Sequence, residues 1–327
     1  MRNLAIVVPI RRTKLLNFFP GKMIEFIQIF IFAVIQGITE FLPISSSGHN
    51  AVIDHLYTRS GHPMTETTAE FIKLDIMVHV GSLIAILIVF RQRIIDLLGK
   101  DRRLIPMLVV ATIPVGVTGL AIYFFAPWVK DNMLVISACF VATGILLLIT
   151  IRRGEGEKTC STMTWKDAII IGCVQGVAIL PGLSRSGATI VAGLFCGLKR
   201  EEAATFSFLL AIPAIAGSGV VEVIVRTRAA ESSAQGIPDW LLIFAGLISC
   251  VTGVIALIFL LDWLKKGKLW YFAIWVFMMA LVTLVLAALP IPEEAEAAQP
   301  PVEVQSIEVQ SVEEQPNETS GLILDEF

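Results

Sequence analysis

The chain has 327 residues, of which 55% are hydrophobic and only 16% are charged. Soluble domains average about 25% charged residues, so the composition excludes an ordinary soluble protein and predicts an integral membrane protein that contacts membrane lipids. The formal net charge is −3, and no nucleic-acid partner is expected.

Hydropathy divides the chain into three parts. Residues 1–22 form an N-terminal extension, 23–290 an integral membrane domain and 291–327 an acidic tail without Lys or Arg. The tail is expected to be disordered, because it lacks the apolar content that offsets the entropy of ordering. Stretches long enough to cross a bilayer, which takes about 20 residues, occur at 71–90, 104–125, 133–151, 203–225, 238–262 and 270–290.

A polar stretch occurs twice in the membrane domain. QGITEFLPISSSGH (36–49) and QGVAILPGLSRSGAT (175–189) both begin with Gln-Gly, continue with Leu-Pro and end in Ser and Gly. This similarity predicts a tandem duplication, with repeat one at 24–151 and repeat two at 166–290.

Each polar stretch lies between apolar stretches too short to cross the membrane, so 24–57 and 166–198 are predicted to be re-entrant helical hairpins. Irregular backbone at membrane depth is tolerated only where it is buried in protein or lines an aqueous cavity. Three spans follow each hairpin, and this odd number inverts the second repeat. The predicted fold is therefore an all-α polytopic membrane protein with an inverted repeat, in which the two polar tips meet near the midplane.

Basic residues orient this arrangement. Lys and Arg concentrate at 91–103, 152–166, 199–200 and 265–268, at one end of the predicted spans. The positive-inside rule assigns this end to the cytoplasm, so the first hairpin opens to the outer side. The basic residues of 1–22 do not fit, since they would also lie outside. Either Met23 is the natural start, or the amino terminus is held on the cytoplasmic side.

Arg185 is the only arginine in a predicted membrane-depth segment, and such a residue indicates a functional site. Hydroxyls at Ser184, Ser186 and Thr189 surround it, in a glycine-containing stretch that is expected to begin a helix. A guanidinium, hydroxyls and free backbone amides together favour an anion site, best suited to phosphate. The alternative is that Arg185 extends to the cytoplasmic surface.

The first polar stretch carries complementary groups. Gln36 and Glu40 share a helix face, from which both could bind one divalent cation through oxygen. Ser45, Ser46 and Ser47 offer nucleophiles, and His49 offers an acid or base near neutral pH. Facing a phosphate site, this set is suited to phosphoryl transfer. The alternatives are a structural ion pair between Glu40 and Arg185, and a hydrogen-bonded core histidine at 49.

Asp75 and His79 form a further pair with helical spacing. They are expected to support the cavity from behind its lining. For the nearby Lys73, placement at the membrane interface is an equal alternative.

QGITEFLPISSSGH and PGLSRSGAT (181–189) resemble the two signature motifs of the bacterial undecaprenyl-diphosphate phosphatase family, known for bacitracin resistance. The hydropathy over about 23–290 is also similar. The resemblance implies hydrolysis of undecaprenyl diphosphate to the monophosphate and inorganic phosphate, which recycles the lipid carrier of cell-wall synthesis. It places the reaction at the outer side of the bacterial cytoplasmic membrane, with Mg²⁺ or Ca²⁺.

By motif position, the resemblance implies a role for each of eight residues. Gln36 and Glu40 would hold the cation, Ser46 would attack or activate water, and His49 would move the proton. The phosphate-binding set would be Ser184, Arg185, Ser186 and Thr189. Many members carry a second glutamate where this chain has Gln36, so one negative charge is missing from the implied cation site.

A flippase or transporter for an anionic polyprenyl lipid is the alternative function, because the same inverted repeat and anion site would serve it. The group of Glu40, Ser46 and His49 favours hydrolysis, since binding alone does not require it. The sequence does not decide whether Ser46 forms a phosphoserine intermediate or only activates water. It also leaves open the oligomeric state, with a homo-oligomer among the alternatives.

Overall fold

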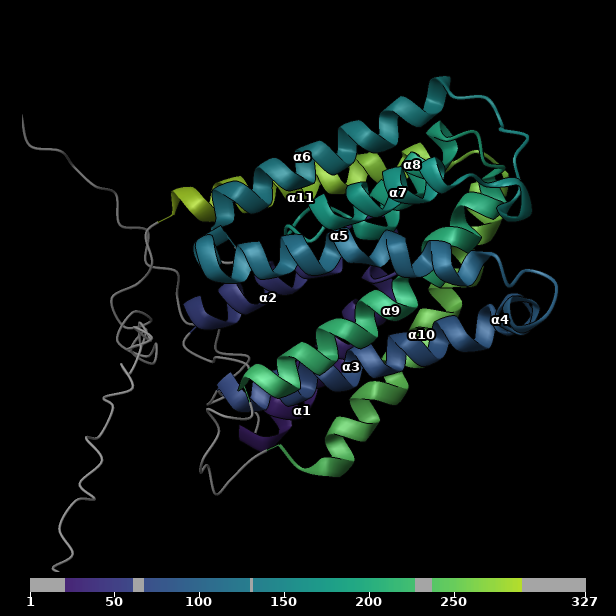
Figure 1. Ribbon diagram of the computed structural model, residues 1–327. Helices are drawn as coiled ribbons and strands as arrows, with labels where there is room; N and C mark the ends of the chain where they lie inside the picture. The colour runs from purple at the N-terminus through teal and green to yellow at the C-terminus, as the bar shows by residue number, and fades with distance from the viewer. Residues whose placement is uncertain (1–20, 61–67, 130–131, 227–236, 290–327) are drawn as a thin grey trace, which may run out of the picture.

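The computed structural model describes residues 21–60, 68–129, 132–226 and 237–289, and in these ranges the structure is helical apart from one isolated β-bridge (Figure 1). Within the described ranges, six helices are long and apolar enough to cross a membrane. They are α3 (Thr68–Val89), α5 (Leu104–Phe125), α6 (Met133–Ile149), α9 (Arg200–Arg226), α10 (Asp239–Lys265) and α11 (Phe272–Ala288). The six predicted spans are thereby confirmed. Residues 1–20 of the predicted extension and the predicted tail lie outside the described residues.

Two pairs of shorter helices occupy the predicted hairpin positions. Hairpin one consists of α1 (Gly21–Thr39) and α2 (Ser46–Arg59), and hairpin two of α7 (Trp165–Val177) and α8 (Arg185–Phe195). In Figure 1 they lie toward opposite ends of the long helices, with α4 (Arg91–Leu98) at the end nearer to hairpin two.

The second helix of each hairpin begins with the same device. Ser45 caps α2 by accepting a hydrogen bond from the Gly48 amide (3.3 Å), and Ser184 caps α8 by accepting one from the Gly187 amide (3.1 Å). A serine at this position satisfies an amide that has no partner within the helix. Since the caps correspond, Ser46 and Arg185 occupy the same position, the first residue of the helix, in the two repeats.

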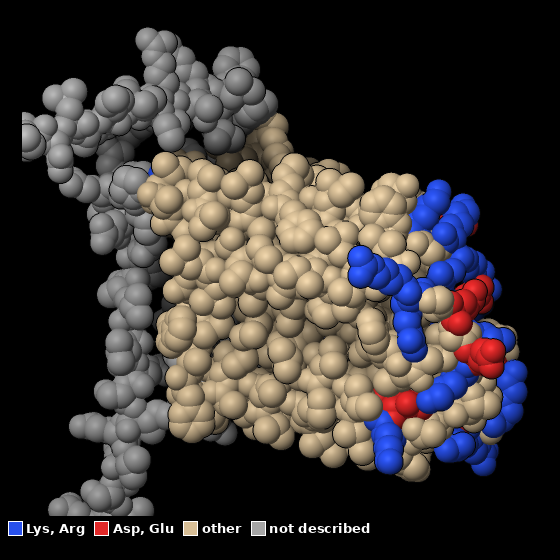
Figure 2. All heavy atoms as spheres, turned by 90° about the horizontal axis from the view of Figure 1, so that it is seen from above, with Lys and Arg blue, Asp and Glu red and all other residues tan. Residues whose placement is uncertain are grey.

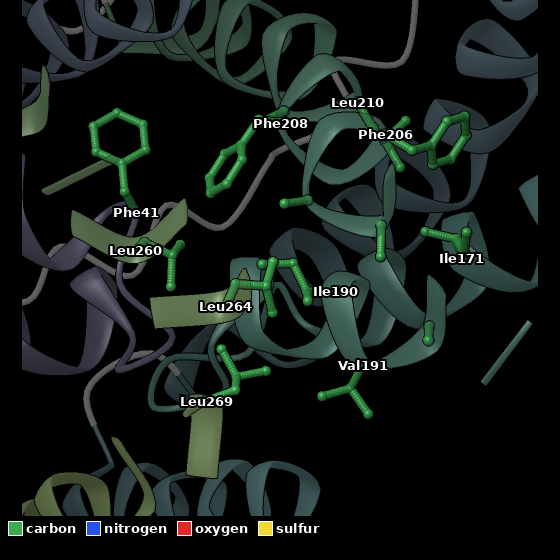
Figure 3. Packing of buried hydrophobic residues seen from close by; sticks show 14 of the residues in the cluster. Phe41, Ile171, Ile190, Val191, Phe206, Phe208, Leu210, Leu260, Leu264 and Leu269 are labelled. Carbon is green, nitrogen blue, oxygen red and sulfur yellow. The ribbon is translucent and has the colours of Figure 1, made fainter. Parts of the chain in front are cut away.

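Corresponding helices of the two repeats make corresponding contacts. The first helix of hairpin one, α1, packs on α10, and the first helix of hairpin two, α7, packs on α5, while α6 packs on α11. These paired contacts are consistent with the predicted inverted repeat. An apolar core holds the hairpin tips in place. In Figure 3, Phe41 from the tip of hairpin one lies beside Phe208 of α9, with 5.9 Å between the ring centroids.

The outer surface fits a membrane. Val109, Ile113 and Val117 of α5 are each more than half exposed, which in lipid is the favoured side for such residues. Figure 2 shows Lys and Arg gathered at one end of the molecule, with an uncharged flank beside it. This is the end at which α4 lies in Figure 1.

Candidate active site

The tips of the two hairpins meet at Ser45 and Gly182. The Gly182 amide donates a hydrogen bond to Ser45 Oγ (3.1 Å). Gly182 has φ +89°, a conformation that favours glycine. The Ser184 amide donates to Thr143 Oγ1 (3.0 Å), and the same hydroxyl donates to the Gly182 carbonyl (2.9 Å), so α6 fixes the turn of hairpin two.

Glu40 lies just past the end of α1 and is buried, with an exposed fraction of 7%. Its Oε1 pairs with Arg185 Nη2. Its Oε2 accepts hydrogen bonds from Ser46 Oγ (2.6 Å) and from Gln36 Nε2 (3.1 Å). A buried charge is tolerated when paired and hydrogen-bonded in this way. The ion pair that the sequence offered as an alternative is therefore present, and it excludes an Arg185 that extends to the surface.

One nitrogen of Arg185 remains without a partner. Nη1 is buried and makes no hydrogen bond within the described structure. The Arg185 side chain lines a small cavity of about 40 Å³, together with Glu40, Ser46, Ser184 and Ser186 among others. A buried donor without a partner calls for an explanation. A cationic donor facing hydroxyls indicates an anionic ligand with oxygen atoms.

The four predicted phosphate-binding residues divide into two groups. Ser184, Arg185 and Ser186 line the small cavity, and Thr189 is not among its lining residues. Thr189 Oγ1 bonds instead to the Arg185 carbonyl (2.8 Å) and to Ser207 Oγ on α9 (2.5 Å). As placed here, Thr189 joins α8 to α9.

A larger cavity of about 760 Å³ adjoins the site. Its polar lining includes Gln36, Asn50, Asp54, Asp75 and His79, and its apolar lining comes largely from α3, α5 and α9. Ser46 lines both cavities. The nucleophile predicted from the sequence therefore stands between a polar space of phosphoryl size and a larger, mostly apolar one.

His49 is placed differently from the prediction. Its Nδ1 lies 2.7 Å from the Ser45 carbonyl, and its Nε2 accepts a hydrogen bond from Trp275 Nε1 (2.9 Å). The ring is nearly coplanar with that of Trp275, at a centroid distance of 6.1 Å, and His49 lines neither cavity. A neutral imidazole has one donor and one acceptor, so both nitrogens are used. This arrangement is that of the hydrogen-bonded core histidine, the alternative that the sequence offered for His49.

The predicted cation pair does not fit a resident metal ion as it lies. Both oxygens of Glu40 accept hydrogen bonds, and Gln36 Oε1 accepts one from Asn50 Nδ2 (2.9 Å). Hard divalent cations need free oxygen ligands. Across the part of the chain that the structure describes, no three His, Cys, Asp or Glu side chains are grouped to hold a metal.

Several contributors to the site were not assigned from the sequence. Asn50 follows Ser46 by four residues, so the helical period of α2 could have indicated it. Thr143 on α6 and Trp275 on α11 carry no local signal, because only the tertiary fold brings them to the hairpins.

Together, the six spans, the two hairpins and the buried anion site define a polytopic membrane protein that acts on an anionic compound at membrane depth. Residues 29–282 match the family described as bacitracin resistance protein BacA, and the chain belongs to this family.

Similar proteins share most of its length. A protein named undecaprenyl-diphosphatase from Rhodopirellula baltica is 38% identical over 264 residues, which cover 81% of this chain and 99% of the relative. Proteins of the same name from Thermodesulfovibrio yellowstonii (37% identical, 79% of this chain, 98% of the relative) and Carboxydothermus hydrogenoformans (38%, 80% and 97%) are also similar.

Proposed function

We infer that this protein hydrolyses undecaprenyl diphosphate to undecaprenyl phosphate and inorganic phosphate. Membership of the family and the names of its relatives support this activity. The observation in the structure that carries it is the free Nη1 of Arg185 in a small hydroxyl-lined cavity, next to Ser46. The product is a lipid carrier that cell-wall synthesis can use again, and the family's name links the reaction to bacitracin resistance.

Binding uses both cavities. The terminal phosphoryl group enters the small cavity, where Arg185 Nη1 and the Ser184 and Ser186 hydroxyls meet its oxygens. Helices α2 and α8 both begin there, and their amino termini favour negative charge. The larger cavity takes the remaining phosphate and the first part of the prenyl chain, along its apolar lining.

Ser46 is the nucleophile in the proposed reaction. Its hydroxyl lies 2.6 Å from Glu40 Oε2, within the range for transfer of its proton to a base. Ser46 Oγ forms a bond to the terminal phosphorus, and its proton passes to Glu40. The anhydride P–O bond breaks, and its electron pair leaves with the lipid monophosphate. Water then hydrolyses the phosphoserine, and the proton held by Glu40 returns to Ser46.

The cation enters with the substrate. Mg²⁺ commonly binds through substrate phosphates and one or two protein groups, and the described residues do not form a prepared site for it. We propose that Mg²⁺ or Ca²⁺ arrives as the complex of the lipid diphosphate.

The active site opens to the outer side of the bacterial cytoplasmic membrane in this proposal. Support comes from the gathering of Lys and Arg at the end away from hairpin one (Figures 1 and 2), since positive charge favours the cytoplasmic side.

Phosphate release tests the function. The purified protein, reconstituted in lipid, is given undecaprenyl diphosphate labelled at its terminal phosphate. We expect release by the wild type, loss in Ser46→Ala, and a normal rate in Ser60→Ala, a control at the exposed far end of α2.

The same assay tests the intermediate and the cation. Acid quenching during turnover should trap protein that carries the labelled phosphate. Chelation should stop release, and Mg²⁺ should restore it. A wild type that transfers labelled lipid across vesicles without releasing phosphate would instead be a transporter.

A further inference from the structure

His79 on α3 faces the same large cavity as Ser46. Its side chain is 28% exposed, and its Nδ1 lies 2.8 Å from the Asp75 carbonyl oxygen and 3.4 Å from Asp75 Oδ2. Its Nε2 lies 3.2 Å from Gln36 Nε2. One ring nitrogen is thus oriented by an acidic residue one helical turn away, while the other points toward the Gln36 and Glu40 end of the site.

Hydrogen bonds around Gln36 fix which nitrogen of His79 carries the proton. Asn50 Nδ2 donates to Gln36 Oε1 (2.9 Å), so the amide nitrogen of Gln36 is the end that faces Glu40 and His79. An amide nitrogen only donates, and therefore His79 Nε2 accepts. The proton of the neutral ring is then on Nδ1, directed at Asp75. The Asp75 carbonyl (2.8 Å) holds the ring in this tautomer, with the Asp75 carboxylate 3.4 Å from the same nitrogen, and Nε2 is left to accept a proton as a general base does.

The two histidines of the site differ in this respect. Both nitrogens of His49 are used by Ser45 and Trp275, and its ring is away from both cavities. Among the described residues, the one hydrogen bond at His79 Nε2 comes from the amide of Gln36, whose other hydrogen serves Glu40. A water molecule between the two groups can accept the hydrogen of the Gln36 amide and donate its own to His79 Nε2. The buried Gln36 donor then keeps a partner.

We propose that His79 accepts the proton of the water that hydrolyses the phosphoserine, and that Asp75 positions it. This step rests on the proposed function. The water oxygen forms a bond to phosphorus, and one of its protons passes to His79 Nε2. The bond between phosphorus and Ser46 Oγ breaks, and the serine recovers the proton that Glu40 took in the first step. Inorganic phosphate leaves, and His79 returns its proton to the aqueous cavity.

Charged groups reach His79 from several elements. Asp75 is on its own helix, Glu40 comes from hairpin one and Arg185 from α8, and Asp54 of α2 lines the same cavity. Packed helices α9 and α10 contribute hydroxyl and apolar groups near this level, such as Ser218 and Ser249.

The test measures turnover, phosphoserine and pH dependence in the reconstituted full chain. In His79→Gln, we expect kcat to fall by about 10²–10⁴-fold, the range for loss of a general base. KM should fall with it and kcat/KM should stay nearly unchanged, because only the second step is slowed. Labelled phosphoserine should accumulate, with an initial burst of lipid monophosphate. The fall of wild-type kcat on the acid side, where His79 becomes protonated, should be absent. His55→Gln, at a histidine of α2 outside both cavities, is the matched control and should behave as the wild type.

A relocation of the base provides the rescue. The Gln36 amide nitrogen lies 3.2 Å from His79 Nε2, so Gln36→Glu combined with His79→Gln puts a carboxylate beside the position of the lost imidazole, and should recover at least tenfold of the lost kcat. Asp75→Asn should displace the acid limb to lower pH and lower kcat less than His79→Gln does.

The proposal is overturned if His79→Gln keeps the wild-type kcat and acid limb, or if only KM rises. If instead the wild type forms no phosphoserine and Ser46→Ala is active, the proposed nucleophile fails. That result is seen without any His79 variant.

Discussion

Glu40 and Arg185, 145 positions apart in the chain, form a buried ion pair where the tips of the two hairpins meet. On insertion scales, a charge at membrane depth costs about 2.5 to 3.5 kcal/mol, and pairing with further hydrogen bonds offsets much of it. The pair is structural through Arg185 Nη2, while the buried Nη1 has no hydrogen-bond partner among the described residues. One arginine can therefore hold the two repeats together and bind a phosphoryl group.

Replacement of Arg185 should affect activity and stability together. In Arg185→Ala we expect phosphate release to fall below detection, because the phosphoryl oxygens lose their cationic donor. The variant should also lose about 3–5 kcal/mol of stability, the usual cost of a buried charge left without its partner. Arg185→Lys keeps the charge and should recover most of the stability but little of the rate, since one ammonium cannot serve both sides. Thermal unfolding and phosphate release are the measurements. Near-normal turnover in Arg185→Ala would exclude the phosphate-binding role.

The bond between Trp275 and His49 should matter for stability and not for proton transfer. In Trp275→Phe, His49 Nε2 becomes a buried acceptor without its partner, at a cost of about 1–3 kcal/mol. His49→Gln should cost a similar amount, and the double variant should lose less than the sum, because one interaction is removed in both. Trp240→Phe, at an exposed tryptophan of α10, is the control. If His49→Gln folds normally and loses the acid limb of the pH profile, proton transfer returns to His49.

Much of the fold was predictable because membrane spans depend on local properties. Apolar length located all six long helices, and the repeated Leu-Pro and Ser-Gly patterns located both hairpins. The duplication also predicted that the two polar tips meet, which the contact of Ser45 with Gly182 bears out. The proximity of Glu40 and Arg185 follows from that symmetry and was not visible from either stretch alone.

The exact role of each polar side chain was less predictable. Nothing in the stretch around His49 shows that its nitrogens are satisfied, because Trp275 comes from a helix 226 positions away. The sequence placed Thr189 among the hydroxyls that surround Arg185. Its hydroxyl instead bonds to its own helix and to Ser207, a common behaviour of Thr in membrane helices. Hydrogen-bond competition of this kind depends on tertiary neighbours.

The turn of hairpin two should be intolerant of a side chain at Gly182. A Cβ atom there would lie 2.4 Å from the Ile136 carbonyl oxygen, on a backbone with φ +89°. Strain and overpacking should cost Gly182→Ala about 2–4 kcal/mol and displace Ser184 and Arg185, with loss of phosphate release. Gly116→Ala on α5, where no heavy atom lies within 4 Å of the added methyl group, should unfold at the wild-type temperature. Equal stability of the two variants would show that the tips are not packed as described.

Asp167 should make the stability of hairpin two dependent on pH. Its carboxylate accepts hydrogen bonds from the Thr164 amide (2.9 Å) and from Lys158 Nζ (3.0 Å) at the start of α7. Burial raises the pKa of this carboxyl, but the Thr164 amide and Lys158 together lower it by more. The pKa is therefore below its usual value. A lowered pKa stabilises the fold above the ordinary aspartate pKa of about 3.9 and loses that effect as the pH falls below it.

Asp167→Asn should therefore reduce the unfolding temperature at pH 7, where the charged hydrogen bonds contribute about 1–3 kcal/mol. The difference from the wild type should shrink below about pH 4, and high salt should reduce the Lys158 part, because that side chain is 39% exposed. Asp262→Asn breaks an exposed pair with Lys266 and should change the unfolding temperature little at any pH. A difference between Asp167→Asn and the wild type that persists undiminished in acid would mean that the asparagine disturbs packing, and that the carboxylate charge does not stabilise the start of α7.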